Sequence, residues 1–120
     1  MTEDMSLDTA LLDETFDTDE EGLRELLDMY WTQADQTVPE LRKAVAAGDS
    51  KNVDYLAHKL AGSSGVCGIA AMVRPLRTLE KCGRAGDLSD AESLLASITE
   101  TLETCRRLVE DYLAAQGAAS

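Results

Sequence analysis

The sequence predicts an all-α protein, an antiparallel up-and-down four-helix bundle with a short extra helix at its N-terminus. Three observations support this prediction. Hydrophobic residues recur at helical spacing along most of the chain, no run alternates as a strand would, and only short turn signals separate the long segments. Short connections favour antiparallel neighbours. The chain of 120 residues suits one core, so we expect a single domain over 1–120 with its core at about 7–113.

The positions of the apolar residues predict five helical segments. Their expected bounds are about 6–15, 18–47, 50–64, 69–84 and 89–113, and residues 114–120 are expected to fray. Pro39 is expected to kink or divide the second segment and Pro75 to bend the fourth, because proline removes an amide donor and clashes with the preceding turn. The short first segment is expected to act as a lid on the bundle.

Turn chemistry supports these bounds. Ser6 is a candidate N-cap, and TDEE at 18–21 indicates a capping box for the second segment. AGDS at 47–50 and AGDLS at 85–89 each place a glycine at a helix end, where left-handed backbone is common, before residues that can cap the next helix.

The charge of the chain argues against two classes of partner. The formal net charge is −12, and the first 28 residues carry 11 acidic side chains and one basic one. Such a surface offers no basic patch for nucleic acid and is repelled by anionic lipid. We interpret the acidic start as a solvated, partly frayed end, with an interaction segment as the alternative.

Other features predict a cytoplasmic protein. The N-terminus lacks a signal-peptide core, and the longest uncharged run, 60–73, is too short to span a membrane. Cys67, Cys82 and Cys105 form no CxxC pair, which suggests neither a disulfide framework nor a zinc site. We therefore expect buried, reduced cysteines and no metal or other cofactor.

The single histidine, His58, is predicted to face solvent. At 100° per residue Leu56, Ala57 and Leu60 share the core stripe, whereas His58 and Gly62 lie on the opposite side. Residues 47–60 align with 85–98, where an alanine takes the place of the histidine, so building such a helix does not require it. Glycine costs a helix roughly 1 kcal/mol, and we interpret Gly62 as leaving the imidazole accessible. The alternative is a surface histidine without a role.

An exposed imidazole keeps a free lone pair on one ring nitrogen while it is neutral. Attack on an activated phosphoryl group would form a phosphohistidine, which mainly requires open space and a few donors. The candidate donors are Lys59, Ser63, Ser64, Gln33 and Gln36. A solvated surface role remains the alternative for Lys59 and the glutamines. GSSG at 62–65 lacks the GxSxG spacing of the nucleophile elbow of a serine hydrolase. The sequence also lacks the phosphate-loop signature of nucleotide-binding proteins.

These residues resemble the histidine-containing phosphotransfer (HPt) domain family. The resemblance rests on HKLAGSS at 58–64, preceded by the AGD turn and followed by GI at 68–69, LE at 79–80 and RAGD at 84–87. It implies a four-helix bundle whose histidine, His58, accepts a phosphoryl group from an aspartyl phosphate on a response-regulator receiver domain and passes it to another receiver. Gly62 then corresponds to the glycine that leaves room for the phosphate and the partner.

The resemblance also implies no kinase activity, with the required magnesium ion belonging to the receiver. The chain departs from the family at Ala61, where members usually carry a lysine, and Lys59 is a possible substitute. Tyr55, Trp31 and Gly62 are candidate docking residues, and we expect a monomer. The alternative functions are a helical adaptor that binds a receiver or histidine kinase without being phosphorylated, and a piece of a larger hybrid kinase.

Overall fold

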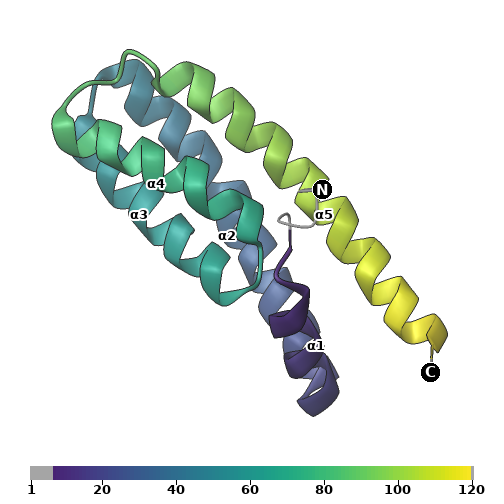
Figure 1. Ribbon diagram of the computed structural model, residues 1–120. Helices are drawn as coiled ribbons and strands as arrows, with labels where there is room; N and C mark the ends of the chain where they lie inside the picture. Colours follow the sequence, from purple (N-terminus) through teal and green to yellow (C-terminus); the bar gives the residue numbers. More distant parts are fainter. Residues whose placement is uncertain (1–6, 120) are drawn as a thin grey trace.

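Four long helices run alternately up and down, and a fifth, short helix lies at one end of them (Figure 1). The computed structural model describes residues 7–119, with side chains through Gln116. The helices are α1 (Thr9–Thr18), α2 (Glu20–Ala47), α3 (Ser50–Val66), α4 (Ala70–Ala85) and α5 (Ala91–Ala119). The predicted fold class is confirmed, and no strand occurs in the part of the chain that the structure describes.

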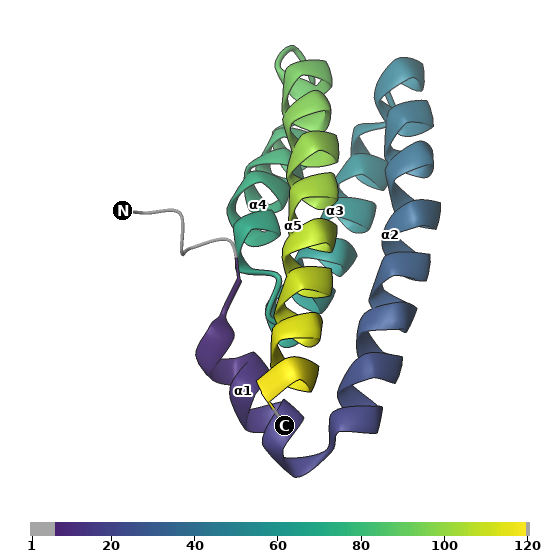
Figure 2. The same cartoon turned by 90° about the vertical axis from the view of Figure 1, so that its right-hand side faces the viewer.

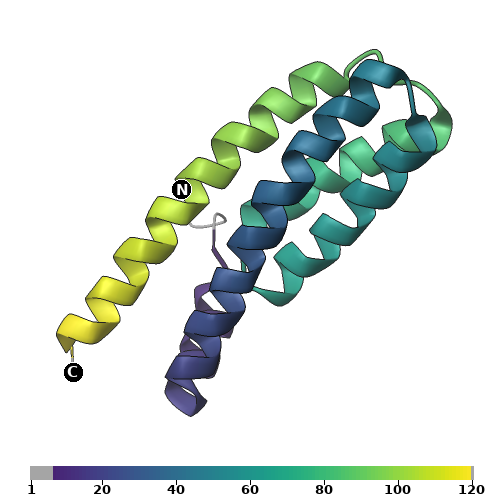
Figure 3. The same ribbon diagram turned by 180° about the vertical axis from the view of Figure 1, so that it is seen from behind.

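The bundle is longer on one side than on the other. Helices α2 and α5 have 28 and 29 residues, whereas α3 and α4 have 17 and 16 and pack most closely against each other. Seen from behind, α2 and α5 continue beyond the turn that joins α3 to α4 (Figure 3). The histidine-bearing helix therefore lies in the densely packed half of the molecule.

Helix α1 covers the end that the two short helices leave open (Figure 2). Leu12 is buried against Gly68 in the α3–α4 turn, and the amide of Asp8 donates to the Gly68 carbonyl at 2.9 Å. The Tyr112 hydroxyl of α5 donates to Asp13 at 2.5 Å, and the Tyr112 ring meets Phe16 edge to face. These contacts fit the predicted lid.

Three expected boundaries are wrong. Helix α1 begins at Thr9 because the Asp8 carboxylate caps it, and Ser6 lies outside the described residues. Asp19, and not Thr18, caps α2 by accepting from the Gly22 amide at 2.9 Å, while the Thr18 hydroxyl bonds back to a carbonyl of α1. Helix α5 continues to Ala119 because its final residues include several alanines, which favour helix.

Other local expectations are confirmed. Gly48 and Gly86 end α2 and α4 with φ angles of 70° and 74°, in the left-handed region that glycine adopts without strain. Asp49 caps α3. Both proline-containing helices continue through Pro39 and Pro75, so neither helix is divided there.

Gly83 permits the close approach of α3 and α4. A Cβ atom at this position would lie 2.5 Å from the Asp54 amide nitrogen and 2.7 Å from the Ser50 carbonyl oxygen. Both are backbone atoms of α3, so they cannot move aside as a flexible side chain would. A residue without a side chain thus sets the separation of the two helices, and with it the position of the histidine relative to α4.

We predict that Gly83→Ala destabilises the fold despite its better helix propensity. The added methyl group would push α4 away from α3, at a cost of about 1–3 kcal/mol in the free energy of unfolding. The matched control is Gly65→Ala, because nothing lies within 4 Å of a Cβ built there, and it should stabilise the protein by up to about 1 kcal/mol. Urea denaturation measures both, and equal stability of the two variants would contradict this account.

Candidate functional site

His58 projects from the solvent side of α3. Its side chain is 62% exposed, whereas Leu56, Ala57 and Leu60 are buried in the core, as the helical spacing predicts. The ring is therefore held by a helix whose opposite face is fixed by packing. It remains accessible to another molecule.

A hydrogen bond to a buried carboxylate orients the imidazole. The Nδ1 atom of His58 lies 2.8 Å from Oε2 of Glu80 on α4. Because an ionised carboxylate only accepts hydrogen bonds, Nδ1 must carry the proton in this contact. In the neutral ring the other nitrogen, Nε2, then has the free lone pair. The contact therefore leaves Nε2 as the ring nitrogen that can act as a nucleophile.

Glu80 pairs with two arginines of α4. The Glu80 side chain is only 7% exposed, and it accepts from Arg77 Nη1 at 2.8 Å and from Arg84 Nη2 at 2.7 Å. The hydrogen bond from Arg77, followed by those involving His58, lowers the pKa of Glu80 below its ordinary value against the opposing effect of desolvation. Arg84 also lies 3.5 Å from Asp54 of α3, which links the cluster to both helices.

Sequence reasoning assigned no role to Glu80, Arg77 or Arg84. A signal was present, however, because Glu80 falls on the apolar stripe of α4 between Leu79 and Gly83. A charged residue on a buried stripe needs partners. Arginines three residues before it and four after it are at the spacing that brings side chains of one helix together.

A hollow of about 410 Å³ lies beside the histidine, between α2 and α3. Nothing among the described residues lies within 4 Å of a Cβ built at Gly62, so neither a turn nor close helix packing requires glycine there. Met29 and Val66 at this hollow are each 69% exposed. Its lining consists of Leu26, Met29, Tyr30, Gln33, Gly62, Ser63, Val66 and Cys67. The site thus combines a polar side on α4 with an apolar side on α2 and α3.

The structure brings some of the predicted support residues to this hollow. Gln33 and Ser63 line it together with Gly62, and Gln36 lines an adjoining hollow on α2 that also includes Gln33. Lys59 is exposed, and its Nζ lies 5.2 Å from the centre of the Tyr55 ring, whose residue is also exposed. Their roles in phosphoryl transfer or docking stay predictions.

Other candidates lie away from the imidazole. Trp31 is half-buried, packs edge to face on Tyr30, and lies under the guanidinium of Arg106 on α5. Ser64 is fully buried, so the suggestion that its hydroxyl serves as an exposed donor is wrong. It donates to the Leu60 carbonyl at 2.7 Å and receives the Tyr30 hydroxyl at 2.6 Å, which ties α2 to α3 behind the site.

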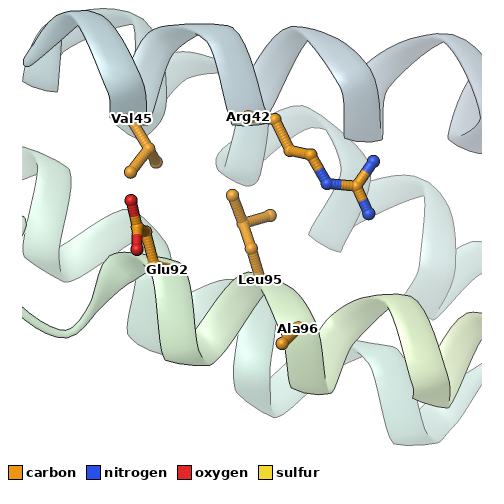
Figure 4. A pocket seen from close by; sticks show the side chains of 5 residues that line it. All are labelled: Arg42, Val45, Glu92, Leu95 and Ala96. Carbon is orange, nitrogen blue, oxygen red and sulfur yellow. The ribbon is translucent and has the colours of Figure 1, made fainter.

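A second hollow, of about 360 Å³, lies between α2 and α5 (Figure 4). It is lined by Arg42, Val45, Glu92, Leu95 and Ala96. Leu95 points into the space between the helices, and Ala96 is the residue that aligns with His58 in the internal comparison. This hollow lacks a nucleophilic side chain among its lining residues, so it offers a matched control surface.

The described residues contain neither a membrane-spanning helix nor a cluster of metal ligands. No helix within 7–119 is both long enough and apolar enough to cross a membrane. The same part of the chain contains no cluster of three or more histidine, cysteine, aspartate or glutamate residues placed to hold a metal ion.

An exposed histidine on a four-helix bundle is the arrangement expected of a phosphotransfer domain, and the comparisons with known proteins agree. The sequence model of the Hpt domain family matches residues 25–115, and the chain belongs to this family. Multistep phosphorelay regulator 1 of Schizosaccharomyces pombe (strain 972) is 32% identical over 80 residues. That match covers 67% of this chain and 27% of the regulator, so the chain spans about a quarter of that relative's length.

A solved structure supports the same fold. Histidine-containing phosphotransfer protein B (HptB) from Pseudomonas aeruginosa PAO1 matches with a TM-score of 0.84 at 24% sequence identity. The match covers 89% of this chain and 93% of the HptB chain. At this level of identity the likeness establishes the fold.

We predict a pH-dependent contribution of Glu80 to stability. Its folded-state pKa is lowered, so the contribution is fully present above the unfolded value of about 4.3 and is lost as the pH falls through the lower folded value. At pH 7 Glu80→Gln should reduce the free energy of unfolding by about 1–3 kcal/mol, and this difference should shrink by pH 3. Denaturation at both pH values, with Glu103→Gln on the exposed face of α5 as the control, tests this. A difference that stays constant between them would contradict it.

Proposed function

We propose that the protein is a histidine phosphotransfer protein of a two-component phosphorelay. His58 accepts a phosphoryl group from the aspartyl phosphate of a receiver domain and passes it to the aspartate of another receiver, and the protein itself has no kinase activity. The single observation that supports this most directly is the exposed imidazole whose Nδ1 is bonded to the buried Glu80, which leaves Nε2 free toward solvent.

The transfer conserves the total charge of the two partners and leaves the proton on Nδ1 of the ring. The lone pair of Nε2 forms the bond to phosphorus while the bond from phosphorus to the aspartyl oxygen breaks and its electron pair stays with the carboxylate. Because Nδ1 keeps its proton, the ring gains positive charge, which the Glu80 carboxylate at 2.8 Å stabilises. In the second transfer a receiver carboxylate attacks phosphorus and the electron pair returns to Nε2. The receiver supplies the magnesium ion.

The hollow beside Gly62 suits the docking of a receiver. HPt proteins of phosphorelays interact with receiver domains, and such a partner must bring its aspartate to within bonding distance of Nε2. Gly62 adds no side chain in front of the ring, and the exposed Met29 of α2 and Val66 of α3 offer apolar contact area in the same hollow. Tyr55 extends this surface along α3. The proposal places the protein in the cytoplasm as a monomer.

His58→Gln should abolish labelling without loss of the fold. The imidazole is exposed, so its replacement removes the nucleophile and leaves the core intact. The measurement incubates wild type and variant with a receiver domain carrying a labelled aspartyl phosphate, and follows acid-labile label on this chain. Stable receiver binding with no label on wild type would instead support the adaptor function.

Gly62→Leu should slow transfer from the receiver by about 10-fold or more while the protein stays folded. A Cβ atom at this position has nothing within 4 Å, and the rest of a leucine side chain would fill space that the partner needs beside the ring. The control is Ala96→Leu in the hollow between α2 and α5, which should leave the transfer rate unchanged. Equal rates for the two variants would show that access at Gly62 is not required.

A further inference from the structure

We infer that Arg77 is the residue that contacts the phosphoryl group on His58 and neutralises its charge. This inference rests on the proposed function and identifies a second residue of the same site. It differs from the expectation that Lys59, one residue after the histidine, would supply the charge.

The position of Arg77 relative to the ring is the first argument. Its Nη1 lies 3.3 Å from Nδ1 of His58 and 2.8 Å from Oε1 of Glu80. Since Nδ1 already donates its proton to Glu80, the contact between Arg77 and Nδ1 places two donors side by side and is not a hydrogen bond. Nδ1 and Nε2 belong to one small ring. One carbon atom separates the two nitrogens, so a rotation of the partly exposed Arg77 side chain would bring its unused donors toward oxygens attached to Nε2.

The donors that remain on Arg77 are the second argument. A guanidinium has five N–H groups, and Arg77 uses one of them on Glu80. Within residues 7–119 the others have no protein acceptor, and the side chain is 42% exposed. They are therefore available to phosphoryl oxygens, which accept charge-assisted hydrogen bonds from arginine. The bond to Glu80 meanwhile holds the guanidinium beside the ring.

The local charge balance is the third argument. Arg77 and Arg84 are matched by Glu80 and Asp54, so this cluster is neutral before phosphorylation. A phosphoryl group adds a charge of about −1.5 to −2, on a protein whose formal net charge is already −12. A nearby cation with unused donors is thus needed to offset the new charge.

The other cations near the site are less well placed. Arg84 contacts Glu80 and Asp54 but not the imidazole, so it acts as a positioning residue for the carboxylate. The Lys59 ammonium lies over the Tyr55 ring. Ala61 is 1% exposed, so its side chain is directed into the core and contributes no charge to the site.

The test phosphorylates His58 with two donors, a phosphorylated receiver and phosphoramidate, a small donor that needs no docking surface. With phosphoramidate the Nε2–P bond forms, the P–NH₂ bond breaks, and ammonia leaves with a proton from solvent. The variants are Arg77→Gln, Arg77→Lys and Arg84→Gln, each checked for folding by circular dichroism. Arg77→Met is a second neutral variant that retains the apolar stem of the side chain.

We expect Arg77→Gln and Arg77→Met to lower the labelling rate by about 5- to 10-fold with either donor, because a partly exposed charge-assisted contact is lost. Arg77→Lys should restore the rate to within about twofold of wild type, and Arg84→Gln, which removes only a contact that supports Glu80, should lower the rate less than Arg77→Gln does. This pattern would show that Arg77 acts through its charge beside the phosphoryl group and not only by supporting Glu80.

A second readout detects that charge directly. The phosphoryl group faces Glu80, Arg77 and Arg84 from α4 and Lys59 and Asp54 from α3. Its ³¹P titration midpoint should rise by about 0.5 in pH in Arg77→Gln, because a neighbouring cation favours the dianion. Unchanged rate and midpoint in Arg77→Gln, or equal losses in Arg77→Gln and Arg84→Gln, would overturn this inference and leave the proposed function standing. A wild-type protein that takes phosphate from neither donor would overturn both.

Discussion

The hydrogen bond between His58 and the buried Glu80 is the contact on which the site depends. It joins the nucleophile on α3 to a carboxylate on α4, fixes which ring nitrogen holds the proton, and sets the direction of the other nitrogen. This poorly exposed carboxylate pairs with Arg77 and Arg84, and the hydrogen bonds from Arg77 and His58 lower its pKa against the effect of desolvation. The close crossing of α3 and α4 at Gly83 makes this 2.8 Å contact possible. Helix packing thus determines the chemistry of one exposed side chain.

The two sides of the histidine serve different needs of phosphoryl transfer. The α4 side holds the charged groups: Glu80 bonds to Nδ1 of the ring, and Arg77 Nη1 lies 3.3 Å from the same atom, which is why we propose that they stabilise the ring and the phosphoryl group. The α2 side supplies shape, since Gly62 leaves space and Met29 and Val66 expose apolar surface. Neither set of contacts requires the hydrophobic core to rearrange. Tyr30 and Ser64 anchor α2 to α3 beneath the site, and burial raises the pKa of the Tyr30 hydroxyl well above its usual value, so that it remains a donor.

Much of this could be predicted from the sequence, because helix periodicity and turn chemistry are local. They gave the five helices, the glycine stops at Gly48 and Gly86, and the outward direction of His58. The caps of α1 and α2 and the end of α5 were misplaced, since neighbouring residues compete as caps and alanines extend a helix. The contact of Glu80 with His58 and that of Trp31 with Arg106 were harder, because each joins two different helices. A helical wheel shows which face of one helix is directed toward the core, but it does not show which neighbouring helix packs against that face.

The most direct test of the account is ¹⁵N NMR of the His58 ring before and after phosphorylation. The account predicts that the neutral form of the free ring carries its proton on Nδ1, and that after phosphorylation the phosphoryl group is bonded to Nε2 with the proton still on Nδ1. A free ring protonated at Nε2, or a phosphoryl group on Nδ1, would contradict the assignment of Glu80 as the residue that orients the nucleophile.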